Sequence, residues 1–245
     1  MKTIFYWMIV CCTLVLSACE KSGAASPDEP VSEKGVVKGR VMNSKGDGLP
    51  NTKVVIEHTV YYGTYVYATT NAAGYYKTTV PAGSWKASVR IEQEFEGKKY
   101  NFDLCPDIAD PFAGSDGAVR NFTWKLKGAR PEGNGFFGSN VVVYTQPGSS
   151  VNIDDVELSL QPVGPLADGL PGTTITATTI DVGGGEDGIA DVPVGKYKIT
   201  ARDTGNGTAL QIRLRNQGAY APSLTALFAS GYTGITTYQI VVEVN

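Results

Sequence analysis

Beyond residue 34, apolar and polar residues alternate in short runs, and this alternation limits the chain to a small set of folds. The runs include Val54-x-Ile56, Val156-x-Leu158-x-Leu160 and Tyr238-x-Ile240-x-Val242-x-Val244, and clusters of Gly, Pro, Asn and Asp separate them. Successive side chains of a β-strand point to opposite faces of its sheet, so a period of two predicts strands with one buried face. No stretch of about 11 residues shows the 3.6-residue period of a helix. The sequence therefore predicts an all-β protein made of β-sandwiches.

The N-terminal residues predict export and attachment to a membrane. Lys2 precedes an apolar stretch at 4–16, which is shorter than the roughly 20 residues of a membrane-spanning helix. The stretch ends in Leu16-Ser17-Ala18-Cys19, which resembles the lipobox of bacterial lipoproteins. The resemblance implies a signal peptide at 1–18, cleavage before Cys19, and lipid on the sulfur of Cys19 as the membrane anchor. The alternatives are a plain secretory signal or a short anchor.

Residues 19–34 predict a flexible tether, because they carry Ser, Ala, Pro and charge without an apolar period. Of the 4 cysteines, Cys19 would carry lipid and only Cys105 would lie in the folded part. A single thiol forms no internal disulfide, so the fold must be stable by packing alone. The neighbours Leu104 and Pro106 supply no base, which favours a buried or half-buried bystander over a reactive nucleophile.

A short repeat predicts two similar halves. Residues 80–85 (VPAGSW) and 192–197 (VPVGKY) share a pattern in which a strand ends at Pro, Gly makes a turn and an aromatic opens the next strand. We therefore expect one sandwich at 35–127 and a second at 128–245. The Gly- and Pro-rich residues 128–135 would form the boundary.

Four motifs of the first half follow one another in an order that resembles a known family. They are residues 35–41 (GVVKGRV), 48–56 (GLPNTKVVI), 70–76 (TNAAGYY) and 80–85 (VPAGSW). This part is similar to the carboxypeptidase regulatory-like domain, a seven-stranded transthyretin-like sandwich common in bacterial envelope proteins. The likeness covers residues 35–91 well and extends loosely to 127, whereas the second half shares only the Val-Pro-x-Gly-x-Tyr turn and the strand order.

The resemblance implies two tandem transthyretin-like or immunoglobulin-like sandwiches and a non-catalytic, accessory role. It also implies that four aromatic residues are buried in the core: Tyr76, Trp85, Trp124 and Tyr197. It carries no catalytic residue. The metallopeptidase that such domains accompany binds zinc through two His and a Glu, and His58 is the only histidine in the chain. The peptidase is therefore absent.

Composition and motifs exclude several classes of function. The net charge is −3 with no basic block, so nucleic-acid binding is not expected. There is no Gly-x-Ser-x-Gly elbow and no phosphate-binding loop, and we predict no catalytic residue and no cofactor. In the alternating pattern His58 falls on the same face of the strand as Val54 and Ile56. This position favours a hydrogen-bonded structural histidine over a catalytic base.

Two acidic loops could supply the oxygen ligands that calcium prefers. Their spacing matches no EF-hand, and Asp-Gly turns are ordinary in hairpins, so solvated turns are favoured and no metal site is predicted. The weak candidates in the first loop are Asp107, Asp110 and Asp116, and those in the second are Asp181, Glu186 and Asp187, with Asp191 close by.

The candidate ligand-binding residues are tyrosines. If Val66 and Ala68 face the core, alternation places Tyr65 and Tyr67 outward, together with Tyr61 if the strand is continuous. We expect Tyr75 to join them across the turn. An exposed aromatic row predicts recognition, because flat rings stack on sugar faces or fill a partner's pocket. The alternative is that the rings pack on the second sandwich or on a neighbouring strand.

These features lead to three hypotheses about function. The first is a non-enzymatic lipoprotein of the bacterial envelope, anchored through Cys19, that acts as an interaction or accessory module. We place it on the outer membrane, at the periplasmic or the surface face, with a glycan or another envelope protein as partner. The second is a glycan-binding surface protein that uses Tyr61, Tyr65 and Tyr67. The third is a pilin-like structural subunit, which would exchange a strand between copies.

Overall fold

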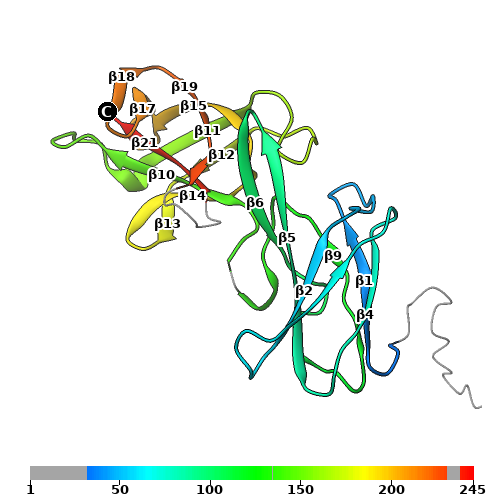
Figure 1. Ribbon diagram of the computed structural model, residues 1–245. Coiled ribbons are helices and arrows are strands. Elements are labelled where there is room, and N and C mark those ends of the chain that lie inside the picture. Colours follow the sequence, from blue (N-terminus) through cyan, green and yellow to red (C-terminus); the bar gives the residue numbers. More distant parts are fainter. Residues whose placement is uncertain (1–31, 134, 231–237) are drawn as a thin grey trace, which may run out of the picture. The chain divides into compact units, whose positions relative to one another are not determined.

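A computed structural model describes residues 32–133, 135–230 and 238–245 of the chain (Figure 1). The predicted signal peptide at 1–18, the lipidation site Cys19 and most of the tether at 19–34 lie outside these ranges. The end of the tether belongs to the fold, since Lys77 Nζ lies 2.7 Å from a carboxylate oxygen of Glu33. In the described ranges, regular structure consists of strands and two 3-10 turns, η1 (Pro131–Gly133) and η2 (Ile153–Asp155). No helix there is long and apolar enough to cross a membrane. The prediction of an all-β sandwich protein is confirmed.

Two sheets form the first sandwich. The strands of one sheet have the order β4-β1-β8, and β9 also pairs with β1: β1 (Val36–Met42), β4 (Tyr75–Thr79), β8 (Ala118–Val119) and β9 (Phe122–Thr123). The strands of the other have the order β3-β2-β5-β6, and β7 also pairs with β5: β2 (Lys53–His58), β3 (Tyr65–Thr69), β5 (Ser84–Phe95), β6 (Lys98–Leu104) and β7 (Phe112–Ala113). Strand β3 therefore lies at an edge of its sheet.

Two further sheets form the second sandwich. In the larger one the order is β13-β14-β10-β21-β17-β18, and β20 also pairs with β21: β10 (Ser139–Thr145), β13 (Ile180–Gly183), β14 (Glu186–Val192), β17 (Ile212–Leu214), β18 (Gln217–Ala221), β20 (Ala229–Ser230) and β21 (Tyr238–Val244). In the smaller one the order is β12-β11-β15-β16, and β19 also pairs with β15: β11 (Val156–Pro162), β12 (Ile175–Thr178), β15 (Lys196–Asp203), β16 (Ala209–Leu210) and β19 (Leu224–Leu227). Strand β10 runs parallel to β21.

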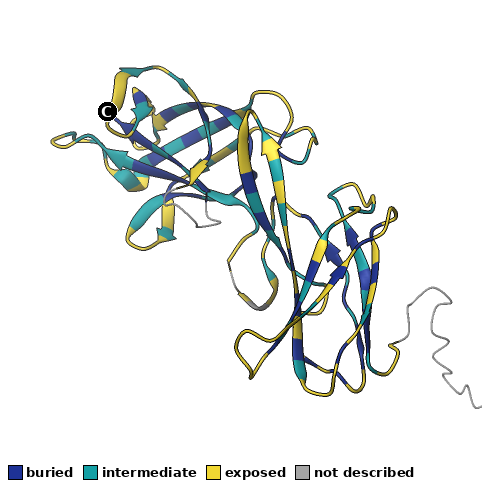
Figure 2. Cartoon of the chain, viewed as in Figure 1, coloured by how far each residue is buried: buried dark blue, intermediate teal, exposed yellow. Residues whose placement is uncertain are grey.

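Burial follows the period of two that the sequence shows (Figure 2). In β2, Val54, Ile56 and His58 are buried while the residues between them are half-buried and Lys53 is exposed. The same alternation places Leu158 and Leu160 of β11 in the core. Apolar side chains on the inner faces of the sheets therefore provide the main stabilisation of both sandwiches.

The repeated turn has the same internal hydrogen bond in both halves. Trp85 Nε1 donates to the carbonyl oxygen of Pro81 at 3.0 Å, and the Tyr197 hydroxyl donates to that of Pro193 at 2.9 Å. Both rings are buried, and burial raises the pKa of the Tyr197 phenol, so its hydroxyl stays protonated and able to donate. Tyr76 and Trp124 are also buried, and all four aromatic core predictions are therefore confirmed.

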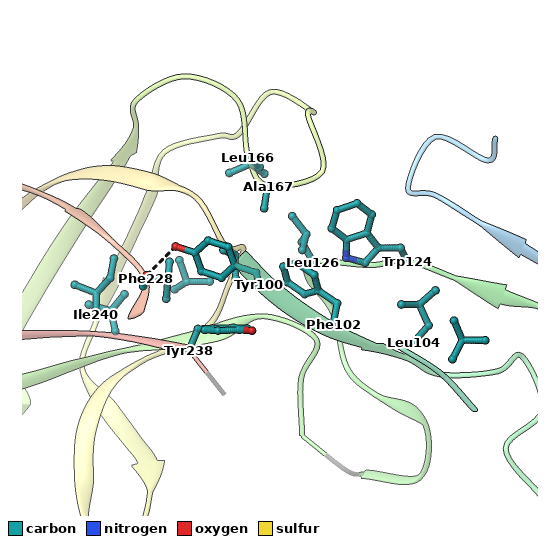
Figure 3. Close-up of a cluster of buried hydrophobic side chains, with 14 of the residues drawn as sticks. Tyr100, Phe102, Leu104, Trp124, Leu126, Leu166, Ala167, Phe228, Tyr238 and Ile240 are labelled. Atoms are coloured by element: carbon teal, nitrogen blue, oxygen red, sulfur yellow. Dashed lines mark hydrogen bonds between the residues drawn. The ribbon is translucent and has the colours of Figure 1, made fainter. Parts of the chain in front are cut away.

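Strand β6 connects the first pair of sheets to the second (Figure 3). The Tyr100 hydroxyl donates to the carbonyl oxygen of Phe228 at 2.8 Å, and the Tyr100 ring meets Tyr238 edge-on at 4.9 Å between ring centroids. Lys196 Nζ also lies 3.1 Å from a carboxylate oxygen of Glu96, in the turn after β5. One continuous buried cluster includes residues of both sandwiches. Division of the chain into domains at residue 128 stays a prediction.

A buried ion pair predicts acid sensitivity. Glu243 is buried in β21, and its carboxylate accepts from Arg213 Nε at 2.9 Å and lies 2.8 Å from Nη2. Burial acts to raise the pKa of this carboxyl, but the Arg213 hydrogen bond and charge outweigh it, so the pKa of Glu243 lies below its usual 4.5. A carboxyl whose pKa is lower in the folded state than in the unfolded state stabilises the fold when the pH is above its unfolded-state pKa. That stabilisation is lost as the pH falls through its folded-state pKa.

We therefore expect Arg213→Met to lower the melting temperature most at neutral pH, because an unpaired buried carboxylate is costly. The difference from the wild type should shrink as the pH falls below about 4.5 and Glu243 takes up a proton. Melting followed by circular dichroism between about pH 7 and about pH 3 measures this. A difference that does not change with pH would show that the pair contributes nothing to the acid sensitivity.

Candidate ligand-binding site

Tyr65 and Tyr67 form a pair of exposed rings on the outer face of edge strand β3. Val66 is half-buried and Ala68 buried, so alternation directs the two tyrosines outward, with 39% and 52% of their surface exposed. Their ring centroids lie 6.0 Å apart and the ring planes differ by 20°. The strand thus presents two near-parallel aromatic rings to solvent, which we call the tyrosine pair.

Polar side chains of the neighbouring strands surround the tyrosine pair. Lys53 Nζ lies 3.9 Å from the centroid of the Tyr67 ring and is held there by attraction to the π-electrons. Across the ladder, Glu57 of β2 stands opposite Tyr65, and Lys86 Nζ of β5 lies 3.4 Å from its carboxylate. The face therefore combines apolar rings with groups that donate and accept hydrogen bonds.

Tyr61 and Tyr75 do not belong to this pair. The strand is not continuous through residues 59–64, which form a turn, and the Tyr61 ring lies 4.6 Å from the imidazole of His58. Tyr75 stands opposite Arg40 in the β4–β1 ladder of the other sheet, and its ring lies 5.3 Å from the guanidinium carbon of Arg40. The expectation that Tyr75 joins the row across the turn was wrong, because β3 and β4 belong to different sheets.

The turn between β2 and β3 exposes two residues that the sequence reasoning did not single out. Val60 is 72% exposed and Tyr62 is 98% exposed. Gly63 follows them with a φ of 74°, a conformation that glycine adopts without strain. The sequence signal was present, because a glycine inside an aromatic run indicates a turn rather than a strand.

His58 has a structural role at the start of this turn. Its Nδ1 accepts hydrogen bonds from the backbone N–H groups of Val60 and Tyr61, each at 3.1 Å. The imidazole packs edge-on against Trp85, with 4.8 Å between ring centroids. The prediction of a hydrogen-bonded structural histidine is confirmed.

Cys105 is half-buried and forms no disulfide within residues 32–133, 135–230 and 238–245. Arg130 Nη1 donates a long hydrogen bond to its sulfur at 3.6 Å. Sequence neighbours alone did not indicate this contact, because the two residues are 25 positions apart.

In the first acidic loop, Asp107 uses its carboxylate to hold nearby backbone. Asp107 accepts from the backbone N–H of Asn121 at 3.0 Å and from the Asn121 side-chain amide at 2.8 Å. Asp116 accepts from the hydroxyl of Ser115 at 3.2 Å. The carbonyl oxygen of Asp110, rather than its carboxylate, accepts from Arg120 at 2.9 Å.

The second acidic loop is similar in this respect. Asp181 accepts from the backbone N–H of Gly183 at 2.7 Å, and Glu186 accepts from the hydroxyl of Tyr144 at 3.0 Å. Asp187 stands opposite Asp181 in the β13–β14 ladder. Across residues 32–133, 135–230 and 238–245, no three His, Cys, Asp or Glu residues gather closely enough to hold a metal ion.

Comparisons with known proteins return solved structures only. No protein-family model matches the chain, and no curated protein matches it. A protein from Pseudomonas aeruginosa, provisionally described as carbohydrate binding, is 16% identical with a TM-score of 0.24, over 40% of this chain and 99% of that one. A DUF3823 family protein from Bacteroides ovatus is 9% identical with a TM-score of 0.25, over 79% and 99%. A C-terminal fragment of the pilus adhesin SpaC from Lactobacillus rhamnosus GG is 10% identical with a TM-score of 0.26, over 86% and 96%. None of these scores supports an argument about function.

Proposed function

We propose that this protein is a non-enzymatic binding protein that takes a glycan on the tyrosine pair, Tyr65 and Tyr67. The observation that carries this proposal is the near-parallel arrangement of the two exposed rings, 6.0 Å apart on the outer face of a sheet. Large exposed apolar groups in a cluster mark interaction sites on soluble domains. Aromatic rings offer flat apolar surface at little entropic cost, which suits the C–H faces of sugars.

The groups around the tyrosine pair support a sugar ligand over a purely apolar one. Lys53 places an ammonium group over the Tyr67 ring, and the carboxylate of Glu57, which pairs with Lys86, stands opposite Tyr65. Sugar rings combine an apolar face with a rim of hydroxyls that donate and accept hydrogen bonds. A site with aromatic faces and charged hydrogen-bonding groups at its border matches both parts.

A pilin-like structural role is our second candidate. It needs a strand to be exchanged between copies of the chain. Strand β1 already pairs within its own chain, with β4 on one side and with β8 and β9 on the other. The exchange would therefore have to displace an existing ladder.

We also propose that the chain contains a carboxypeptidase regulatory-like domain at 35–127 that serves as an accessory module. The four motifs that carry the resemblance support this. They lie on or beside β1, β2, β4 and β5, in that order. The structural use of His58 supports a role without catalysis.

Lipid on Cys19 is the proposed anchor, and it would place the protein in a bacterial envelope. The proposal rests on Leu16-Ser17-Ala18-Cys19. We expect radiolabelled palmitate to enter the wild-type protein and the Cys19→Ser variant to take up none, because only a thiol at that position accepts the lipid. The Cys105→Ser variant serves as control and should be labelled like the wild type. Equal labelling of the Cys19→Ser variant would contradict the proposal.

A glycan array tests the proposed ligand class. The protein, purified as the cell makes it, should bind a subset of the oligosaccharides on the array. The Tyr65→Ala/Tyr67→Ala variant should bind none of that subset above background. Binding that is equal in both proteins, or no binding to any glycan by the wild type, would overturn the proposal.

A further inference from the structure

A cleft of about 390 Å³ opens at β6, the opposite edge of the sheet that carries the tyrosine pair. Asn101 and Asp103 of β6 form one wall, and Tyr238 of β21 contributes to another. Lys125 and the loop after it, including Arg130, complete the cleft, which the apolar ring of Phe136 also lines. This volume falls within the range typical of small-molecule sites, roughly 300–1,000 Å³.

The cleft carries an excess of positive charge. Lys125 and Arg130 both line it, and neither forms an ion pair with a carboxylate in the part of the chain that the structure describes. Asp103 is the only carboxylate among the lining side chains described, and Arg90 neutralises it with two hydrogen bonds of 2.6 and 3.1 Å. Two cations without a counter-charge in a concave site favour an anionic ligand.

The ring of Phe137 holds the two cations near each other. Lys125 Nζ lies 5.7 Å from its centroid and the guanidinium carbon of Arg130 lies 5.0 Å from it. Arg130 Nε also donates to the carbonyl oxygen of Phe136 at 2.8 Å. The guanidinium is therefore placed before any ligand arrives, which lowers the entropic cost of binding.

The loop that bears Arg130 and Phe137 is fixed at both ends by Asp191. Its carboxylate accepts from the backbone N–H of Gly128 at 2.9 Å and from that of Gly138 at 3.0 Å. Asp191 has a φ of 57°, a strained value for a residue other than glycine. A strained aspartate that holds a cleft-forming loop is consistent with a built site.

The outer face of the sheet joins the cleft to the tyrosine pair. In the registers of the sheet, Val55 stands opposite Tyr67, Ser88 opposite Val55, and Asp103 opposite Arg90. Adjacent strands lie about 4.8 Å apart, so β3 and β6 are separated by about 14 Å across the sheet. An extended oligosaccharide of several units can span that distance.

We propose that the cleft is an acidic-sugar subsite of the glycan site. It takes the carboxylate of a uronic acid unit beside Lys125 and Arg130, with the side-chain amide of Asn101 available to the sugar hydroxyls. The rest of the chain crosses the sheet to the tyrosine pair. The ligand class is thus a carboxylate-bearing glycan rather than a neutral one, and this inference rests on the proposed function.

Calorimetric titration of the whole protein tests the subsite. The probes are an oligouronate of about four units and the neutral oligosaccharide made from it by reducing its carboxyl groups. We expect the oligouronate to bind about tenfold more tightly, and Lys125→Gln to remove most of that difference. Lys198→Gln is the matched control, because Lys198 is an exposed lysine of β15 that lines none of the cleft. It should change neither affinity.

The outcomes separate this inference from the proposed function. Equal affinity for the two probes, unchanged by Lys125→Gln, would overturn the acidic subsite. The proposed function would then still hold if Tyr65→Ala/Tyr67→Ala weakens binding of both probes. Lys198→Gln could also reduce the preference for the oligouronate as much as Lys125→Gln does. That result would indicate general charge attraction and would overturn the subsite. Binding of neither probe, with no glycan bound on the array, would overturn both.

Discussion

Replacing Tyr65 and Tyr67 together by alanine should weaken glycan binding about 10- to 100-fold and leave the fold intact. Each aromatic ring that stacks on a ligand contributes on the order of 1 kcal/mol or more, and about 1.4 kcal/mol corresponds to a tenfold change in affinity. Both rings stand on the outer face of β3, and neither belongs to the buried cluster. Substitutions at such surface positions usually change stability by only about 0.5 kcal/mol.

Tyr75→Ala is the matched control for this double variant. Tyr75 is 54% exposed, close to the 52% of Tyr67, and it too lies near a cation, Arg40. It stands on the other sheet, so its loss should leave the affinity unchanged. Calorimetric titration with a glycan that the array identifies measures the affinity of the wild type, the double variant and Tyr75→Ala. Circular dichroism checks that each of the three proteins is folded. A Tyr75→Ala variant that binds as weakly as the double variant would argue against a site on β3.

Trp85→Ala should lower the free energy of unfolding by about 3–5 kcal/mol, the usual cost of removing a large aromatic side chain from a core. Only 2% of its surface is exposed, and its indole packs against His58. An alanine would leave a cavity at the turn, and the carbonyl oxygen of Pro81 would lose the hydrogen bond that Nε1 donates at 3.0 Å. The backbones of Gly83 and Gly114 lie against the indole, so the gap cannot close without moving the turn.

Urea unfolding followed by circular dichroism measures this loss. Trp85→Phe is the control, because it removes the donor and part of the ring but keeps an aromatic side chain in the core. It should cost less, about 1–2 kcal/mol. Tyr197→Phe removes the equivalent donor to Pro193 in the second sandwich and should cost about 1 kcal/mol. A Trp85→Ala variant as stable as the wild type would show that the turn does not depend on its aromatic residue.

The alternation of apolar and polar residues along the chain was sufficient to predict most of the strands and their buried faces. The alternation in 54–58 and 156–160 predicted which side chains face the core, and the repeat at 80–85 and 192–197 predicted two equivalent buried aromatics. These inferences succeed because side-chain direction in a strand depends only on position along the strand. The outward direction of Tyr65 and Tyr67 follows from the same rule.

Errors and omissions arose where the answer depended on pairing between strands. Tyr75 follows Tyr67 closely in sequence, yet its strand pairs with β1 and not with β3. Periodicity carries no information about which strands share a sheet, because non-local hydrogen bonds and core packing decide that choice. The sequence also left open whether the strand continues through 59–64, since an aromatic run resembles a strand until its glycine is taken as a break.

The cleft shows most clearly what a linear pattern cannot supply. The backbone N–H of Asn101 donates to the hydroxyl of Tyr238, although the two residues are 137 positions apart. Arg130 reaches the same cleft as Lys125 because Asp191, a residue of β14, holds both ends of the loop that bears Arg130. Neighbours along the chain fix the strands, their buried faces and the outward direction of the tyrosine pair, so periodicity predicts all three. The grouping of exposed side chains into a site comes from the folded chain, because long-range packing brings distant strands and loops to one place.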